Sequence, residues 1–130
     1  MSTGRQVLVA VYAVFALAAG ARSVVQLATR ADVAPLAYSL SLVAAVVYLV
    51  ATLALRRAGV AAYRVALAAV TFELVGVLVV GTLTVLDGQL FPDQTVWSTY
   101  GVGYGFVPLL LPIAGLWWLQ RHRPAEEPVR

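Results

Sequence analysis

Polar and charged residues divide the sequence into four long apolar runs. These runs cover residues 7–27, 36–55, 65–86 and 103–119. A helix of about 20 residues, rising roughly 1.5 Å per residue, crosses the roughly 30 Å hydrocarbon core of a bilayer. Only helices and closed barrels satisfy their backbone in lipid, and the runs lack the alternation of barrel strands. The pattern therefore predicts an all-α polytopic membrane protein, a bundle of four transmembrane helices.

Residues at the ends of the runs set the expected helix limits. Asp32 and Pro35 precede the second run, as an N-cap and a first-turn proline do. A basic turn with a helix-stopping glycine, Arg56-Arg57-Ala58-Gly59, ends that run. We expect a single transmembrane domain over residues 1–130, with helices at about 7–28, 36–55, 62–86 and 103–120 and a short tail over 121–130.

Composition narrows the class further. Of the 130 residues, 62% are hydrophobic and only 12% are charged, about half the charged fraction of a soluble domain. There is no cysteine, which excludes disulfides and thiolate metal sites. His122 is the single histidine and has no second ligand nearby, so we expect neither a metal nor another cofactor.

Basic residues predict the orientation. With four spans, the N-terminus, the second connection and the C-terminus share one side of the membrane. Arg22 and Arg30 belong to the other side, whereas seven arginines belong to the first: Arg5, Arg56, Arg57, Arg64, Arg121, Arg123 and Arg130. This positive-inside bias predicts cytoplasmic termini and a multi-pass protein of the plasma (inner) membrane. Heavy use of Ala, Val and Arg is typical of a GC-rich bacterial genome.

The N-terminal run also allows a second interpretation. Arg5, the apolar residues from Val7 and the stretch Ala19-Gly20-Ala21 together resemble a secretory signal with its cleavage site. Cleavage would leave three spans with the N-terminus outside. The apolar character continues through Val24 and Val25, which favours an uncleaved span.

Glu73 is the one charge in the run 65–86 and falls close to the expected membrane midplane. A carboxylate there must be neutral, paired or wetted, since burying it bare costs several kcal/mol. Small residues, including Ala66, Ala69 and Gly76, share its helix face. Small residues let helices approach closely in lipid, so Glu73 is expected to face protein.

Depth matching along the helices predicts an internal polar network. Arg22 and Gln26 lie towards the outer leaflet, Ser41 and Tyr48 follow one stripe of the second helix, and Glu73 lies below. The partner of Glu73 is Arg22, Tyr48 or a water molecule. The network serves either helix packing or a proton or cation path.

Aromatic residues predict anchors at both membrane interfaces. Trp97, Tyr100 and Tyr104 fit the outer interface, and Trp117 and Trp118 fit the inner one. The glycines between the outer aromatics are not a dinucleotide fingerprint, because no strand precedes them. The alternative for the outer segment is a lid or a docking surface.

Two resemblances bear on the class. The segment Trp97–Trp118, WSTYGVGYGFVPLLLPIAGLWW, resembles a pattern of small actinobacterial four-helix integral membrane proteins of no known activity. That resemblance implies a bacterial plasma membrane. The small size and the intramembrane acid are also similar to small multidrug-resistance transporters. Their essential Glu lies in the first helix, where this chain has Arg22 and no acid, so no residue role carries over.

Two hypotheses for function follow. The first is a structural or accessory subunit of a membrane assembly, which contacts the lipid bilayer and either self-associates or binds a larger membrane protein. The second is an oligomeric proton- or cation-coupled transporter or channel that uses Glu73. The sequence contains no nucleophile–base set and no soluble domain, so we expect neither an enzyme nor a nucleic-acid-binding protein.

Overall fold

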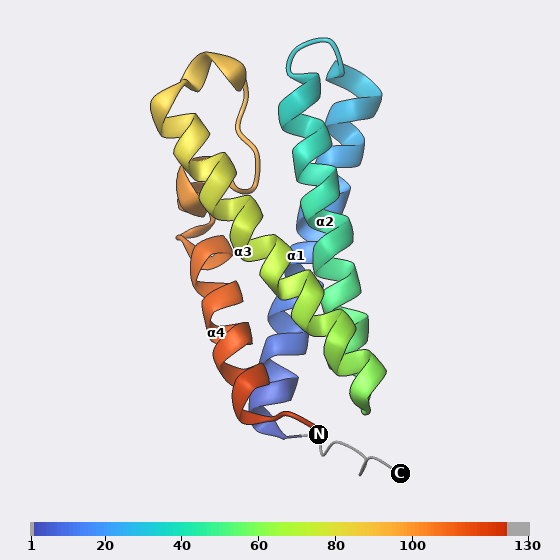
Figure 1. Ribbon diagram of the computed structural model, residues 1–130. Helices are drawn as coiled ribbons and strands as arrows, with labels where there is room; N and C mark the ends of the chain where they lie inside the picture. The colour runs from blue at the N-terminus through green and yellow to red at the C-terminus, as the bar shows by residue number, and fades with distance from the viewer. Residues whose placement is uncertain (1, 125–130) are drawn as a thin grey trace.

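A computed structural model of the protein describes residues 2–124. Four α-helices make up most of this part of the chain, and two short 3-10 helices lie between the third and the fourth (Figure 1). The elements are α1 (Thr3–Arg30), α2 (Pro35–Leu55), α3 (Val60–Leu86), η1 (Gly88–Leu90), η2 (Ser98–Tyr104) and α4 (Val107–Arg121). Residues 2–124 contain no β-strand.

Local sequence explains where the first three helices begin. α1 starts before the apolar run because the Ser2 hydroxyl accepts the Arg5 N–H at 3.2 Å and so caps the helix. Pro35 occupies the first turn of α2, where its missing N–H costs nothing. α3 follows Gly59, whose φ of 105° suits glycine alone, and no side chain caps its first turn.

The helices are those of a membrane-embedded protein. In the described part of the chain, α1, α2 and α3 are each long and apolar enough to cross a membrane. A fourth candidate exists only if η2 and α4, which meet at a bend of 99°, count as one broken span. Large apolar side chains such as Leu17, which is 75% exposed, cover the outside. Such a surface suits lipid rather than water.

The chain runs up and down between two ends (Figure 1). At the terminal end lie the starts of α1 and α3 and the ends of α2 and α4; the distal end holds the α1–α2 connection and the end of α3. α1 packs against α2, α2 against α3, and α3 against α4. Small residues line these contacts: Ala37, Ala44 and Ala51 of α2 are fully buried. Close backbone approach is what stabilises helix packing in lipid.

α4 begins at Val107 rather than at the expected residue 103, and its 15 residues give a helix of roughly 22 Å. The helix cannot start earlier because Tyr100, Gly101 and Phe106 have left-handed backbones, with φ of 60°, 84° and 61°. Gly101 has no room for a side chain, since a Cβ there would lie 2.6 Å from Pro108. α4 alone is therefore shorter than the hydrocarbon core.

Residues 87–106, the descending segment, make up the missing length. They return from the distal end towards the middle of the protein before α4 begins (Figure 1). Side chains accept their backbone donors: the Val96 N–H bonds Ser41 Oγ at 3.2 Å, and the Thr99 N–H bonds Thr84 Oγ1 at 2.7 Å. Irregular backbone is tolerated at membrane depth only when it is satisfied inside the protein. These bonds satisfy part of the backbone of the descending segment inside the protein.

Candidate functional site

A buried hydrogen bond between Tyr12 and Glu73 lies at the centre of the protein. Both side chains are fully buried, and the Tyr12 hydroxyl donates to Glu73 Oε1 at 2.5 Å. Gly115 of α4 makes room for this hydroxyl, because a Cβ at that position would lie 3.3 Å from it. Three helices thus meet at this hydrogen bond: α1 supplies the donor, α3 supplies the acceptor, and α4 leaves room for them with a glycine.

Among residues 2–124, no basic side chain forms an ion pair with Glu73. Its second oxygen, Oε2, has no hydrogen-bond partner among the described residues. The ion pair found within residues 2–124 joins Arg30 to Asp93 at the distal end. A bare buried carboxylate costs several kcal/mol, whereas a neutral acid with one hydroxyl partner costs far less. The geometry therefore suits an uncharged Glu73.

Trp97 covers this pair on its distal side. Its indole Nε1 donates to the Tyr48 hydroxyl at 2.8 Å, and the Tyr48 ring lies 6.1 Å from the ring of Tyr12. Trp97 also packs on Gly76, where a Cβ would lie 2.6 Å from the indole. Gly76 follows Glu73 by one helical turn, so the indole fills the next layer of the interior.

The predicted network residues fall into two groups. Tyr48 and Glu73 belong to the central layer, but Tyr48 bonds to Trp97 and Glu73 to Tyr12. Arg22 lies nearer the distal end, where its Nη1 donates to the Tyr104 hydroxyl at 3.3 Å; its side chain is exposed rather than internal as expected. The structure thus does not pair Arg22 with Glu73.

The second group, which lies nearer the distal end, lines a small cavity. Arg22, Ser41, Thr95 and Tyr104 line a space of about 10 Å³, close to the volume needed for one water molecule. Gln26 is buried one turn further along α1. Arg22 and Ser41 therefore share one water-sized space above the Tyr12–Glu73 layer.

Tyr12 was absent from the expected network. One signal in the sequence points to it: it is the one hydroxyl-bearing residue in the stretch 7–21, which is otherwise apolar. A lone polar side chain in such a stretch needs a partner when it is buried. Glu73 is the corresponding lone acid of α3, so the two outliers could have been matched.

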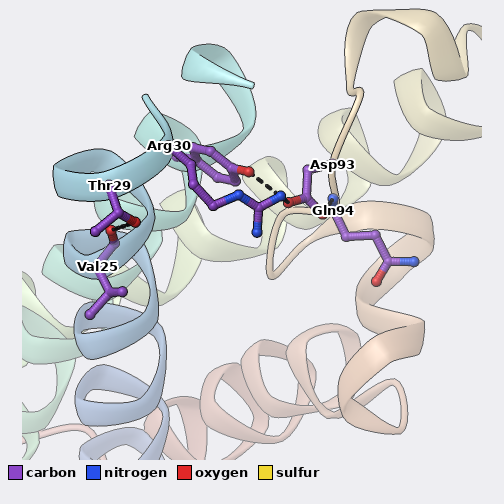
Figure 2. A network of polar contacts seen from close by, with 6 residues as sticks. Val25, Thr29, Arg30, Asp93 and Gln94 are labelled. Carbon is purple, nitrogen blue, oxygen red and sulfur yellow. Dashed lines mark hydrogen bonds and ion pairs between the residues drawn. The ribbon is translucent and has the colours of Figure 1, made fainter. Parts of the chain in front are cut away.

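The distal end carries a second polar cluster, centred on Asp93 (Figure 2). The Tyr38 hydroxyl donates to Asp93 Oδ2 at 2.7 Å, and Arg30 Nη2 lies 3.7 Å from the same oxygen. The Gln94 N–H donates to Oδ1 at 2.8 Å. The hydrogen bond from Tyr38, followed by that from Gln94, lowers the pKa of Asp93 below its usual value. This cluster ties α1 and α2 to the descending segment.

The expected interface anchors differ in position. Trp97 and Trp118 are 2% and 6% exposed, so both lie inside the protein rather than at its surface, and each packs against another helix. Tyr100 is half-buried, packs against Gly81 and shares a hydrogen bond of 2.9 Å with Thr82.

Tyr104 and Trp117 are more exposed than Trp97 and Trp118. Tyr104 is half-buried, and its ring lies 5.6 Å from the ring of Phe15. Trp117 is 57% exposed and lies 4.4 Å from the Arg121 guanidinium, which is the geometry of an interface anchor. The aromatic residues therefore divide between interior packing and the surface.

Neither a metal-binding site nor a similarity to known proteins adds to the description of this site. Across residues 2–124, no group of three or more His, Cys, Asp or Glu side chains is placed to hold a metal ion. No protein-family model, curated protein or solved structure matches the sequence. The class is therefore set by the fold and the buried pair: a membrane-embedded, all-helical protein with a Tyr–Glu hydrogen bond at its centre.

Proposed function

We propose that the protein is a non-enzymatic structural or accessory subunit of a membrane assembly. In this proposal four spans cross a bacterial plasma membrane, with η2 and α4 forming a broken fourth span. The terminal end faces the cytoplasm, because Arg56, Arg57, Arg64 and Arg121 lie there. Both chain termini then share that side.

The observation that carries the proposal is the enclosed Tyr12–Glu73 bond. α1 and α3 are separated in the packing order by α2, yet this bond joins them directly. A buried hydrogen bond between helices specifies how they pack, since any other arrangement would leave the acid alone in an apolar interior. Trp97 and Gly115 close the space around it. The enclosed bond therefore supports a structural role in helix packing.

The outer surface supports assembly with a partner. An open hollow of about 480 Å³ on α3 is lined by Arg64, Leu67, Ala68, Thr71 and Phe72. Thr71 is exposed in the middle of a span, where a hydroxyl is better placed against a protein than against lipid. A second copy of this chain, or a helix of a larger membrane protein, fits this face.

One observation favours the alternative, an oligomeric proton- or cation-coupled transporter. Glu73 Oε2 is buried and lacks a partner among residues 2–124, which is a suitable place for a transferable proton. The cavities of about 170 and 10 Å³ are lined by other residues, so neither of them leads to Glu73.

The substitution Glu73→Gln separates the two functions. Under the accessory proposal the variant stays folded and assembled, because its amide oxygen still accepts the Tyr12 hydrogen bond, and wild-type liposomes show no pH-driven flux of protons or small cations. Under the transporter alternative the variant oligomer stays folded but loses proton-coupled movement. Reconstituted liposomes with a pH-sensitive dye, run beside crosslinking of the assembly, measure both.

Tyr12→Phe is the matched variant, because it removes one hydroxyl and keeps the ring. A double-mutant cycle of Tyr12→Phe with Glu73→Leu, which removes the acceptor, should give a coupling of about 1 kcal/mol, the usual size for interhelical hydrogen bonds in membranes. Proton flux in wild-type liposomes that is lost in Glu73→Gln but kept in Tyr12→Phe would overturn the accessory proposal.

A further inference from the structure

A cavity of about 170 Å³ opens at the terminal end, where all four α-helices contribute to its wall. Its lining combines small and apolar residues with several basic and aromatic side chains. Arg5 comes from α1, Arg57 from the α2–α3 turn, Tyr63 from α3, and Trp118 and His122 from α4 and its end.

The aromatic wall of the cavity is built in layers. The Arg5 guanidinium lies 5.2 Å from the Trp118 ring centre, and the His122 ring stacks on the Trp118 ring with centres 4.2 Å apart and planes 11° apart. His122 Nδ1 lies 2.8 Å from the Trp118 carbonyl oxygen. A carbonyl only accepts, so Nδ1 carries the hydrogen and the imidazole is fixed in place.

Trp118 also has an unused donor. The residue is 6% exposed, and its Nε1 has no hydrogen-bond partner among the described residues. Buried indole N–H groups usually find an acceptor. Nε1 lies against α1 at Gly4, where a Cβ would come within 2.9 Å of it. Trp118 therefore contributes its ring to the cavity wall, while its Nε1 is buried against α1 without a partner among the described residues.

Nothing in the described chain neutralises this end. The acidic residues within residues 2–124 are Glu73 at the centre and Asp32, Asp87 and Asp93 at the distal end. The first turn of α3 also lies at the cavity, with Gly59 in its lining and no side-chain cap. Uncapped N–H groups and the positive end of a helix dipole favour an anion there.

We propose that this cavity binds a phosphate group at the bilayer surface. Guanidinium groups bind phosphate oxygens with two parallel hydrogen bonds, and basic pockets between transmembrane helices hold anionic lipid headgroups. The phosphodiester of an anionic phospholipid and free inorganic phosphate share this chemistry. The ligand site is independent of the role of Glu73, which lies in another layer of the protein.

Ligand titrations of the full chain in an uncharged detergent test the proposal. Thermal unfolding and Trp fluorescence are followed with dioctanoyl phosphatidylglycerol, with dioctanoyl phosphatidylcholine and with inorganic phosphate. Saturable stabilisation by phosphatidylglycerol alone assigns the headgroup of an anionic lipid. Equal saturation by inorganic phosphate assigns the free anion. The full chain keeps Glu126 and Glu127, which lie outside the described residues, present as competing carboxylates.

Neighbouring arginines supply a matched pair of variants. Arg57 lines the cavity and Arg56 does not, although both are exposed in the same turn. Arg57→Gln should weaken phosphate-dependent binding about ten-fold, as loss of one charged hydrogen bond does, and Arg56→Gln should change it less than about two-fold.

Two results would overturn the proposal. One is an equal loss of affinity in Arg57→Gln and Arg56→Gln, which would mean diffuse attraction to a basic surface. The other is the absence of saturable binding by both phosphatidylglycerol and inorganic phosphate at millimolar concentration. Arg57 is exposed, so its substitution leaves the fold intact and the comparison valid.

Discussion

The distal half and the terminal end of the protein enclose their interiors in opposite ways. In the distal half the descending segment returns into the protein, and side chains such as Ser41 and Thr84 bind its backbone donors. At the terminal end the four helices leave a cavity of about 170 Å³, with the Trp118 donor unpaired among the described residues. The descending segment fills the interior of the distal half, whereas the terminal end keeps an open cavity.

The difference follows from the length of α4. Its 15 residues cover the terminal half of the protein but do not reach the distal end, so irregular backbone must fill the remainder. Such backbone survives at membrane depth only if every donor is paired. The terminal end consists of regular helices and needs no such filling. Its open cavity is the site at which we propose that a phosphate group binds.

Removal of the Trp97 indole should give the largest effect. Trp97→Ala loses a fully buried ring, its packing on Gly76 and its bond to Tyr48, and should destabilise the protein by about 3–5 kcal/mol. Trp117→Ala, at a position 57% exposed, should cost less than about 1 kcal/mol. Unfolding in mixed micelles of increasing SDS content measures both. Similar losses in the two variants would mean that the descending segment does not close the distal half.

Filling the space beneath the indole should have the next largest effect. Gly76→Ala places a Cβ 2.6 Å from the Trp97 ring, so it should cost about 1–3 kcal/mol by overpacking. Gly20→Ala is the helical control, since its Cβ would meet Ala45 at an ordinary 3.7 Å. That variant should be neutral or slightly stabilising. The same unfolding assay compares them, and a neutral Gly76→Ala would contradict the close contact.

The helices of this protein could largely be predicted from its sequence, because long apolar runs leave a chain in lipid few other options. α2 and α3 end at the expected residues 55 and 86. The start of α4 could not be predicted. Tyr100 and Phe106 are non-glycine residues with positive φ, held by contacts that no local pattern encodes.

The candidate site was predictable only in part. The lone acid in the run 65–86 identified Glu73, but depth along a helix does not fix which neighbouring helix supplies the partner. Tyr12 reaches Glu73 because Gly115 leaves room for its hydroxyl, and that depends on how three helices pack together. The aromatic pattern likewise placed Trp97 at an interface, whereas its contact with Gly76 depends on the fold of the descending segment.

Loss of the Ser41 hydroxyl should give a smaller effect on the same half. Ser41→Ala leaves the Val96 N–H without its acceptor in the interior and should destabilise the protein by about 1 kcal/mol. Ser39→Ala, on the exposed face of α2, is the matched control and should have little effect. Hydrogen exchange at the Val96 amide reports the change directly. An unchanged exchange rate would show that the amide has another acceptor.

The smallest effect should come from protonation of Asp93, whose side chain is 26% exposed. Its pKa is lower in the folded protein than the usual 3.8, chiefly through the Tyr38 hydrogen bond. A group with a lowered folded pKa contributes stability above its unfolded pKa and loses it as pH falls through the folded value. Stability should therefore begin to fall below about pH 5 and continue to fall until the pH is below the folded pKa of Asp93. Asp93→Asn should flatten this part of the profile, and Tyr38→Phe should weaken it. Identical profiles for wild type and Asp93→Asn would show that the distal cluster adds no pH-dependent stability.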